Sequence, residues 1–225
     1  MKHIVVLTGA GMSAESGLKT FRDSNGLWEG HDVMKVASPE GFRANPELVL
    51  DFYNQRRRQL KEVEPNKAHK ALAELEKEFN VSIVTQNVDN LHERAGSTNV
   101  IHLHGELCKI RSSANLDDVR EWTEDINIGD VCDRGHQLRP HIVWFGEAVP
   151  MIEKAAEICA TADILVIIGT SMQVYPAASL IHYTKPNIPM YYIDPSPASV
   201  ELQNIKVIPK SATEGIEELI PLLKN

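Results

Sequence analysis

Three polar side chains that could take part in chemistry, Gln86, Asn87 and Asp89, occur in the motif TQNVDNLHERAG, directly after an apolar segment. Carboxamide and carboxylate groups can hydrogen-bond the hydroxyls of a sugar or the amide of another carboxamide. His104, in the motif HLHGE, follows the next apolar segment. An imidazole titrates near neutral pH and can act as a general base, but a histidine at a strand end is also commonly a hydrogen-bonded core group. The residue types alone leave both interpretations of His104 open.

A glycine-rich turn, GAGMSAESG, follows the first apolar segment and contains Gly9, Ala10 and Gly11. Small residues between a strand and a helix let backbone N–H groups approach a pyrophosphate, but the same pattern also forms tight turns that bind nothing. A dehydrogenase would continue into a second strand that ends in an acidic residue about 20 residues further on. The stretch after Gly17, LKTFRDSNGLWEG, instead contains turn residues that predict a loop. A dehydrogenase is therefore the least favoured class of nucleotide-binding enzyme.

Six short segments rich in β-branched apolar residues must position these groups. They cover residues 4–7, 81–85, 100–103, 164–168, 190–193 and 206–208. Helical stretches between them favour a parallel sheet covered on both faces, so the predicted fold class is α/β, with a Rossmann-like doubly wound sheet of about six strands. Small or polar residues follow each segment; they are either helix caps or, where the carboxyl ends of the strands meet, the lining of a ligand crevice.

Two segments do not belong to this alternation. Residues 31–75 predict helices, one of which begins at the proline of PELVLDFYNQRRRQLKEV. Residues 107–140 lack a strong period and are rich in Asp, Asn, Ser and Gly. We interpret both as insertions that form a smaller lobe beside a Rossmann-like domain made of residues 1–30, 76–106 and 141–225. A cleft between the two lobes is expected.

The composition limits the class of protein. With 225 residues, 43% of them hydrophobic, the chain can form one substantial core with a small insert. The formal net charge of −8 argues against a nucleic-acid partner, since phosphate binding calls for a basic face. No apolar run approaches the ~20 residues that span a bilayer, and the first strand begins too early for a secretory signal. The three cysteines suit a reducing compartment, so we expect a cytoplasmic protein with no membrane partner.

Five motifs, taken in order, resemble those of the sirtuins, the NAD-dependent protein-lysine deacylases. They are GAGMSAESG followed by FR, then TQNVDNLHERAG, HLHGE, LRPHIVWFGE and IIGTSMQVYPAA. The resemblance covers essentially the whole chain, and five ordered motifs are far more specific than a single glycine pattern. It implies that the glycine-rich turn binds NAD and that the loop after it covers the cofactor.

The resemblance also implies a reaction and its residues. Cleavage of the nicotinamide bond lets the acyl oxygen of the substrate lysine bond to the ribose, and water then releases O-acyl-ADP-ribose. His104 would be the general base on a ribose hydroxyl, Asp89 would hold the nicotinamide carboxamide, and Asn87 would orient the ribose and a water; these three are the expected catalytic residues. The expected NAD-binding residues are Gly9, Ala10, Gly11, Glu15, Phe21, Arg22, Gln86, Asn87, Asp89, His104, Gly169, Thr170, Ser171, Asp194 and Ala212. Tyr192 stands where the family often has an asparagine near the adenosine ribose, and Asp194 is expected to serve there instead.

Tyr53 and Arg56 lie three positions apart in DFYNQRRRQL, on one face of a predicted helix. From spacing alone, a core tyrosine and a solvated arginine are the plainer interpretation. In the sirtuins, however, a Y-x-x-R pattern marks the class that removes succinyl and malonyl groups, and Ala37 resembles a small residue that widens the acyl pocket. An arginine and a phenol can bind the carboxylate that ends such an acyl chain. The resemblance therefore implies a desuccinylase and demalonylase that also retains deacetylase activity.

The peptide side of the substrate has an expected site as well. Val143, Trp144, Phe145 and Gly146, within IVWFGE at 142–147, resemble the strand that pairs with the backbone of the acylated protein, a case of β-augmentation. The expected partners are therefore protein lysines that carry succinyl, malonyl or acetyl groups, and the protein itself is expected to be a monomer.

The sequence departs from the family at the zinc site. Most sirtuins hold zinc in the small lobe with two C-x-x-C pairs, which supply four soft ligands in tetrahedral geometry. The equivalent positions here are Ser112, Asn115, Cys132 and Gly135. Only one ligand remains, so no metal is expected; an irregular site that uses Cys108, Asp133 and His136 is the less favoured alternative.

Two other classes of function remain open. An ADP-ribosyltransferase would use the same activated NAD but would pass the ribosyl group to a protein side chain. A non-catalytic NAD-binding module would keep the sheet and the glycine turn but would not need the set of His104, Asn87 and Asp89, which is complete here.

Overall fold

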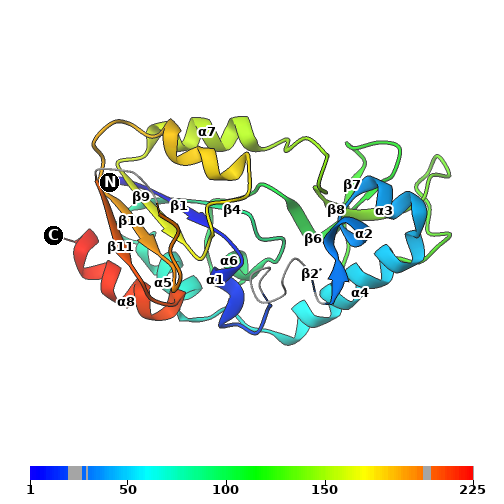
Figure 1. Ribbon diagram of the computed structural model, residues 1–225, viewed down its shortest axis with the longest axis horizontal. Coiled ribbons are helices and arrows are strands. Elements are labelled where there is room, and N and C mark those ends of the chain that lie inside the picture. Colours follow the sequence, from blue (N-terminus) through cyan, green and yellow to red (C-terminus); the bar gives the residue numbers. More distant parts are fainter. Residues whose placement is uncertain (20–26, 29, 200–203, 225) are drawn as a thin grey trace.

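The computed structural model describes residues 1–19, 27, 28, 30–199 and 204–224, and it has two lobes (Figure 1). The larger lobe is built on a six-stranded sheet, and both ends of the chain lie on its side of the molecule. The smaller lobe is built on a three-stranded sheet with helices beside it. A third, two-stranded sheet pairs β2 (Leu27–Trp28) with β3 (His31–Asp32).

The large sheet is entirely parallel. Its strands are β1 (His3–Thr8), β4 (Asn80–Thr85), β5 (Val100–His102), β9 (Ile164–Ile168), β10 (Met190–Ile193) and β11 (Ile205–Ile208). Their spatial order is β11-β10-β9-β1-β4-β5. Counted along the chain and read from β5, this is the order 3-2-1-4-5-6 of a Rossmann fold. The six predicted strands and the doubly wound class are confirmed, and each strand end differs from its predicted position by at most one residue.

Helices cover both faces of this sheet (Figure 1). The helices of the larger lobe are α1 (Gly11–Ala14), α5 (Lys67–Leu75), α6 (Leu91–Arg94), α7 (Ile152–Thr161), the 3-10 helix η2 (Ala177–Tyr183) and α8 (Ala212–Leu223). Ile4 and Val6 of β1 pack on the side of α5 and α8, whereas Val5 and Leu7 pack on the side of α7 and η2. Burial on both faces explains why these strands are continuous apolar runs rather than alternating ones. No helix of the described residues is both long and apolar enough to cross a bilayer.

The two predicted insertions meet in the smaller lobe. Its elements are α2 (Val33–Val36), α3 (Pro39–Ala44), α4 (Pro46–Glu62), β6 (Gly105–Ser112), β7 (Val119–Glu121) and β8 (Leu138–Ile142). Strand β6 pairs antiparallel with both β7 and β8. Helix α4 begins at a proline, and the side chain of Asn45 caps it by accepting a hydrogen bond from the backbone N–H of Leu48 at 3.1 Å. Leu50 of α4 packs with Ile110 and Leu138 in the core of this lobe.

Helix α5 lies within the predicted insertion 31–75 but packs on the large sheet. Leu72 and Leu75 belong to the same core cluster as Ile4. The cap of α5 also ties it to the glycine-rich turn, because the Asn66 side chain accepts from the first backbone N–H groups of the helix and donates to the carbonyl of Met12 at 2.9 Å. By its contacts α5 belongs with the Rossmann-like sheet; the full set of domain bounds stays a prediction.

The loops after β1 and β9 touch where the strand order of the sheet reverses. The backbone N–H of Gly9 donates to the carbonyl of Ile168 at 3.1 Å, and that of Gly11 donates to the carbonyl of Gly169 at 2.8 Å. Gly169 has φ +63°, and a Cβ there would lie 2.3 Å from the backbone nitrogen of Met12. Glycine is therefore required at these positions by the contact between the two loops.

This contact predicts that Gly169→Ala lowers the free energy of unfolding by about 3 kcal/mol or more, because a Cβ both strains a positive φ and overlaps backbone atoms. Gly129→Ala is the matched control: Gly129 has φ +95°, but nothing lies within 4 Å of an added Cβ. Only the conformational strain, about 1 kcal/mol, should remain there. Urea unfolding followed by circular dichroism compares the two variants, and equal losses would contradict the role given to the loop contact.

Candidate active site

A cavity of about 1240 Å³ lies at the carboxyl edge of the large sheet and extends to the smaller lobe. Almost all the residues that the sequence predicts for the site line it: Gly9, Ala10, Gly11, Glu15, Ala37, Tyr53, Arg56, Gln86, Asn87, Asp89, His104, Val143, Trp144, Phe145, Gly146, Gly169, Thr170, Ser171, Asp194 and Ala212. The remaining two, Phe21 and Arg22, lie outside the described residues. The structure therefore brings together side chains from both lobes, as the strand-end argument predicts.

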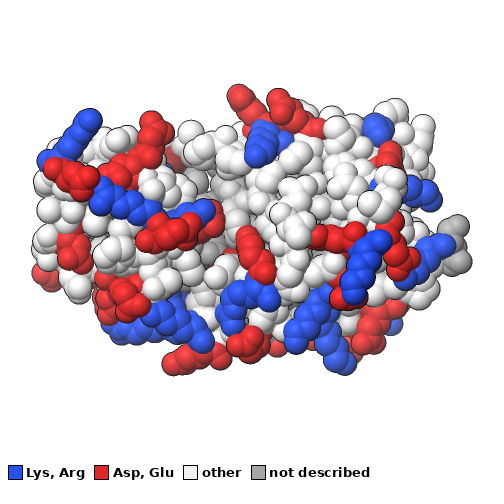
Figure 2. Space-filling model, turned by 180° about the vertical axis from the view of Figure 1, so that it is seen from behind, with Lys and Arg blue, Asp and Glu red and all other residues white. Residues whose placement is uncertain are grey.

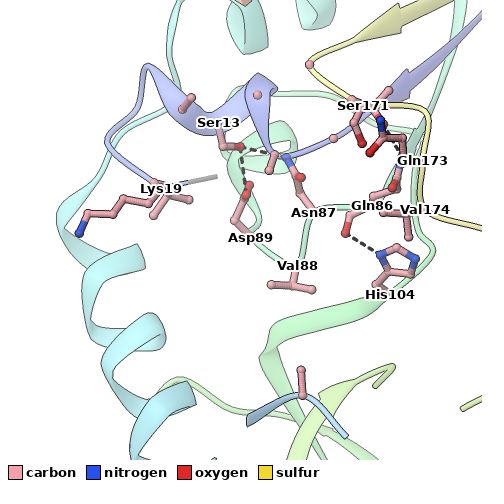
Figure 3. A pocket seen from close by; sticks show the side chains of 18 of the residues that line it. Ser13, Lys19, Gln86, Asn87, Val88, Asp89, His104, Ser171, Gln173 and Val174 are labelled. Carbon is pink, nitrogen blue, oxygen red and sulfur yellow. Dashed lines mark hydrogen bonds between the residues drawn. The ribbon is translucent and has the colours of Figure 1, made fainter. Parts of the chain in front are cut away.

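A buried chain of hydrogen bonds joins two of the expected catalytic residues, Asn87 and Asp89 (Figure 3). The side-chain amide of Asn87 donates to the Ser13 hydroxyl at 3.1 Å, and that hydroxyl donates to Asp89 Oδ2 at 3.0 Å. Ser13 comes from α1, directly after the glycine-rich turn. Sequence reasoning missed Ser13, whose only signal is its place within GAGMSAESG. Its hydroxyl fixes how both neighbouring side chains are turned.

The Asp89 carboxyl is held at both oxygens. Its other oxygen, Oδ1, accepts from the backbone N–H of Leu91, at the start of α6, at 3.1 Å. Burial raises the pKa of Asp89, and the bonds from Leu91 and Ser13 offset this only in part. Both oxygens accept a hydrogen bond and the carboxyl is buried, so its orientation is fixed. In this orientation it can accept a hydrogen bond from an amide.

The hydrogen-bond partner of His104 fixes its tautomer. Nδ1 lies 3.1 Å from the backbone carbonyl of Gln86 (Figure 3). A carbonyl can only accept, so Nδ1 carries the proton and Nε2 keeps its lone pair. Burial lowers the pKa of His104 by more than the bond to the carbonyl raises it. His104 is therefore neutral at pH 7 and can take up a proton at Nε2, as a general base must.

Gln86 connects the ends of two strands. Its backbone N–H donates to the carbonyl of Thr8, the residue that ends β1, at 2.9 Å. Its side-chain amide donates to the Thr170 hydroxyl, in the loop after β9, at 3.1 Å. The amide oxygen of Gln86 is thereby oriented by groups outside its own strand.

Glu15 caps α8. Its carboxylate accepts from the Ser211 hydroxyl at 3.1 Å and from the backbone N–H and hydroxyl of Thr213 at 2.9 and 2.6 Å. Burial alone would raise the pKa of Glu15, but the bonds from Thr213 and Ser211 outweigh it and lower the pKa. Glu15 thus joins the glycine-rich turn to the start of α8 beside Ala212; direct contact of Glu15 with a cofactor stays a prediction.

Tyr192 braces the loop that follows β10. Its hydroxyl donates to the carbonyl of Thr170 at 2.8 Å and accepts from the backbone N–H of Ala198 at 3.1 Å. Asp194 turns the same loop, because its Oδ1 accepts from the backbone N–H of Ser196 at 2.8 Å. Asp194 lines the cavity and Tyr192 does not, which is consistent with the expectation that Asp194 rather than Tyr192 faces the cofactor.

Tyr53 belongs both to the core and to the cavity wall. It is fully buried in a cluster with Phe52 and Trp144, as the plainer interpretation of its spacing expects. Its hydroxyl accepts from the indole N–H of Trp144 at 3.0 Å. Burial raises the pKa of Tyr53, so the phenol stays neutral and keeps its proton. The Arg139 guanidinium lies over the Trp144 ring, 3.2 Å from its centre, in a cation–π contact that stabilises the position of the ring.

The three consecutive arginines of α4 have different surroundings. Arg56 lines the cavity, and its guanidinium lies 4.9 Å from the centre of the Phe52 ring. Arg57 is buried and donates to the carbonyl of Leu107 at 3.1 Å. Arg58 is exposed and pairs with Asp125, with one bond of 3.1 Å. Of the three, Arg56 alone reaches the cavity.

Strand β8 ends at Ile142, so residues 143–147 of the expected peptide-binding strand are not strand in this structure, and their contact with a peptide stays a prediction. The chain then turns, with Gly146 at φ +91°. Glu147 causes this turn, because its carboxylate accepts from the backbone N–H of Trp144 at 2.8 Å and from the buried Arg139 at 2.7 Å. Arg111 adds a further bond to Glu147 at 3.0 Å. These two arginines and Glu147, which the sequence reasoning did not single out, hold the segment in shape.

The positions equivalent to the family's zinc ligands do not fit the metal. The Ser112 hydroxyl hydrogen-bonds the Cys132 thiol and lowers its pKa, while Cys132 packs with Leu138 in the core of the lobe. Arg120 forms ion pairs of 2.9 and 3.0 Å with Asp118 and Asp133 nearby. Among the described residues, no group of three His, Cys, Asp or Glu side chains could hold a metal ion. Hydrogen bonds and ion pairs therefore hold the side chains around Cys132, and the absence of a metal stays a prediction.

The surface charge of one face is mixed. Figure 2 shows acidic and basic side chains interspersed over both lobes on this side of the molecule. This face carries no large basic field of the kind that phosphate backbones require.

A Rossmann-ordered sheet with a glycine turn and a polar cluster at its switch point defines the class of α/β nucleotide-binding proteins. Comparison with known proteins narrows this class. A family model described as the Sir2 family matches residues 9–176. An NAD-dependent protein deacylase of Helicobacter pylori is 58% identical over 224 residues, which cover 99% of this chain and 98% of the relative. The chain therefore belongs to the Sir2 family.

Solved structures agree with this assignment. A complex of a Sir2 homologue with NAD has a TM-score of 0.89 and 39% identity, and the match covers 99% of this chain and 90% of that one. A Sir2 structure with a deacetylated p53 peptide and 3′-O-acetyl ADP-ribose has a TM-score of 0.84 and 27% identity, over 97% of this chain and 92% of that one.

The small lobe should be independent of zinc. We expect elemental analysis of the purified protein to find far less than one zinc per chain, and a strong chelator to leave the thermal midpoint unchanged, because Cys132 is a single soft ligand and its thiol is already hydrogen-bonded. Cys132→Ala should behave as a small core truncation that costs about 1 kcal/mol. Stoichiometric zinc together with unfolding by the chelator would contradict this interpretation.

Proposed function

We infer that this member of the Sir2 family is an NAD-dependent protein-lysine deacylase that removes succinyl and malonyl groups and also acetyl groups. One observation carries the inference. Asn87, Asp89 and a neutral His104 converge on one cavity with their orientations fixed by hydrogen bonds, and Tyr53 and Arg56 line that same cavity.

The cavity residues fit NAD. Gly9, Ala10 and Gly11 of the glycine-rich turn line the cavity with small residues, as a pyrophosphate site requires, and Asp89 offers a fixed acceptor for a carboxamide. NAD, when bound, supplies the nicotinamide–ribose bond whose cleavage creates the acceptor carbon for the acyl oxygen. By the resemblance, Gly169, Ser171 and Ala212, which line the cavity, would lie beside its pyrophosphate and adenosine.

The chain's own groups supply orientation and proton transfer. Ser13 holds the Asn87 amide and the Asp89 carboxyl together, so both present one arrangement to the nicotinamide end. His104 holds its proton at Nδ1 and would take a second proton at Nε2 from a ribose hydroxyl, which makes that oxygen a better nucleophile. Nδ1 stays bonded to the Gln86 carbonyl throughout, so the ring need not turn when it becomes charged.

The acyl preference rests on charge. A succinyl or malonyl chain ends in a carboxylate, for which Arg56 offers a planar fork of donors and Tyr53 a neutral phenol. Ala37, whose carbonyl accepts from the backbone N–H of Phe145 at 2.9 Å, is a small residue in the wall of the same cavity. An acetyl group has no carboxylate and gains nothing from Arg56, so its removal depends on the remaining residues.

The segment of Val143, Trp144, Phe145 and Gly146 would contact the peptide. Three of its backbone N–H groups already have partners within the protein. Val143 donates to the carbonyl of His104 and Phe145 to that of Ala37, both at 2.9 Å, and Trp144 donates to the Glu147 carboxylate at 2.8 Å. Pairing with a substrate peptide would therefore use the remaining backbone groups of this turn. The monomeric state and the cytoplasmic location expected from the sequence stay predictions.

Mass spectrometry of matched succinyl-lysine and acetyl-lysine peptides, incubated with and without NAD, tests the proposal. We expect NAD-dependent loss of succinyl faster than of acetyl, with formation of O-succinyl-ADP-ribose. Loss of acetyl alone would keep the deacylase and return Tyr53 and Arg56 to a purely structural role. An ADP-ribosylated peptide would indicate a transferase, and NAD binding with no product would indicate a non-catalytic module.

Arg56→Met tests the proposed carboxylate contact. We expect kcat/KM for the succinyl peptide to fall about 10- to 100-fold, the loss of a charge-assisted hydrogen bond, while kcat/KM for the acetyl peptide changes little. Arg58→Met is the matched control, because it removes the same charge from α4 at an exposed ion pair. If Arg56→Met leaves desuccinylation intact and abolishes deacetylation, Arg56 does not bind the acyl carboxylate.

A further inference from the structure

His102, in β5, is bonded on both sides of its ring although it is not one of the expected catalytic residues. Nδ1 lies 2.9 Å from the backbone carbonyl of Asn87, and Nε2 lies 2.7 Å from Glu93 Oε1. The ring is largely buried, whereas Glu93 in α6 is partly exposed, with 40% of its side-chain surface accessible. The pair thus connects the surface to the backbone of the candidate catalytic loop.

The two acceptors determine the charge of the ring. The Asn87 carbonyl can only accept, so Nδ1 needs a proton, and the Glu93 carboxylate also accepts, so Nε2 needs one as well. Only the imidazolium satisfies both bonds. A neutral ring would present a lone pair either to the carboxylate or to the carbonyl.

The charged groups around His102 are consistent with this assignment. Burial lowers the pKa of His102, but the bond to Glu93, the charge of Glu93, the bond to Asn87 and the charge of Glu106 together raise it above the ordinary value. Asp89 also faces the ring, while the neighbouring His92 is itself neutral because burial lowers its pKa. Glu93 shows the reciprocal effect. Burial raises the pKa of Glu93, but the hydrogen bond from His102, the charge of His102 and the charge of Lys109 lower it below the ordinary value.

Other buried histidines nearby behave in the opposite way. His69 contacts His92 ring to ring at 4.8 Å, and burial lowers its pKa to about 4. Burial also lowers the pKa of His104, which faces a carbonyl but no carboxylate. The raised pKa of His102 therefore follows from its acid partner and not from its position in the fold.

The bond from His102 is one of three that hold successive backbone carbonyls of the candidate catalytic loop, residues 86–89. The carbonyl of Gln86 accepts from His104, that of Asn87 from His102, and that of Val88 from the backbone N–H of Leu107 at 2.8 Å. Because a peptide unit is planar, fixing the Asn87 carbonyl also fixes the Val88 N–H, which points the opposite way. Release of this carbonyl would let the peptide unit between Asn87 and Val88 rotate.

We propose that protonated His102, paired with Glu93, is a positioning residue that holds the Asn87 carbonyl and thereby the working orientation of Asn87 and Asp89. This inference rests on the proposed deacylase function. It predicts that kcat falls as pH rises and His102 loses its proton, whereas the fall at acid pH belongs to His104, which must be neutral to act as a base. Stability contributed by the pair is likewise present at low pH and is lost as pH rises through the raised pKa of His102.

The first test is a side-chain NMR titration of the unliganded protein. We expect His102 to titrate above about 6.5, the ordinary value for histidine, and Glu93→Gln to bring that titration down by about one pH unit. Glu106→Gln is the matched control, because it removes a nearby charge that bonds Lys109 and not His102; it should shift the titration less. A His102 that titrates below the ordinary value would overturn the proposal whether or not the protein proves to be a deacylase.

The second test is the pH profile of kcat. We expect kcat of the wild type to fall at alkaline pH, and Glu93→Gln to move this fall to lower pH. His102→Gln should remove the fall and lower kcat about 10- to 100-fold, with little change in KM. Glutamine cannot titrate, and because its donors lie on one nitrogen it cannot donate to both the Asn87 carbonyl and Glu93 as the ring does. The partly exposed Glu93 can be changed without opening the core. An alkaline fall unchanged by both substitutions would overturn the proposal, whereas a wild type without NAD-dependent activity would count against the proposed function instead.

Discussion

The close approach of two loops at the switch point of the sheet is the constraint on which the site depends. Gly11 donates to the carbonyl of Gly169 at 2.8 Å, and neither loop has room for a side chain there. The contact sets α1 directly beside the end of β4, so that Ser13 lies between Asn87 and Asp89. The same contact brings the Thr170 hydroxyl within hydrogen-bond distance of the Gln86 side-chain amide. A shift of either loop would therefore break the hydrogen bonds that orient the candidate catalytic groups, which is why a backbone contact matters as much here as any side chain.

Partners rather than positions decide what each buried polar group can do. His102 and His104 are two residues apart and both largely buried, yet burial lowers the pKa of His104 while a carboxylate raises that of His102. Each bonds a carbonyl of the same loop, through the same ring nitrogen. The strand edge thereby combines a base that must be neutral with a support that must be charged. This difference comes from Glu93, which reaches His102 from another element.

The parts of the structure that the sequence predicts are those with local signals. The six strands are buried on both faces, so each is a continuous apolar run that stands out from the chain. Ser13 and the Glu93–His102 pair carry no such signal, because a serine 76 residues away from its partner looks like any other serine. The segment after Ile142 shows the reverse error: Val143, Trp144 and Phe145 have strand propensity, but the bonds to Glu147 override it and turn the chain. The ion pairs of Glu147 with Arg111 and Arg139 form only in the folded protein, so the sequence pattern does not predict where this strand ends.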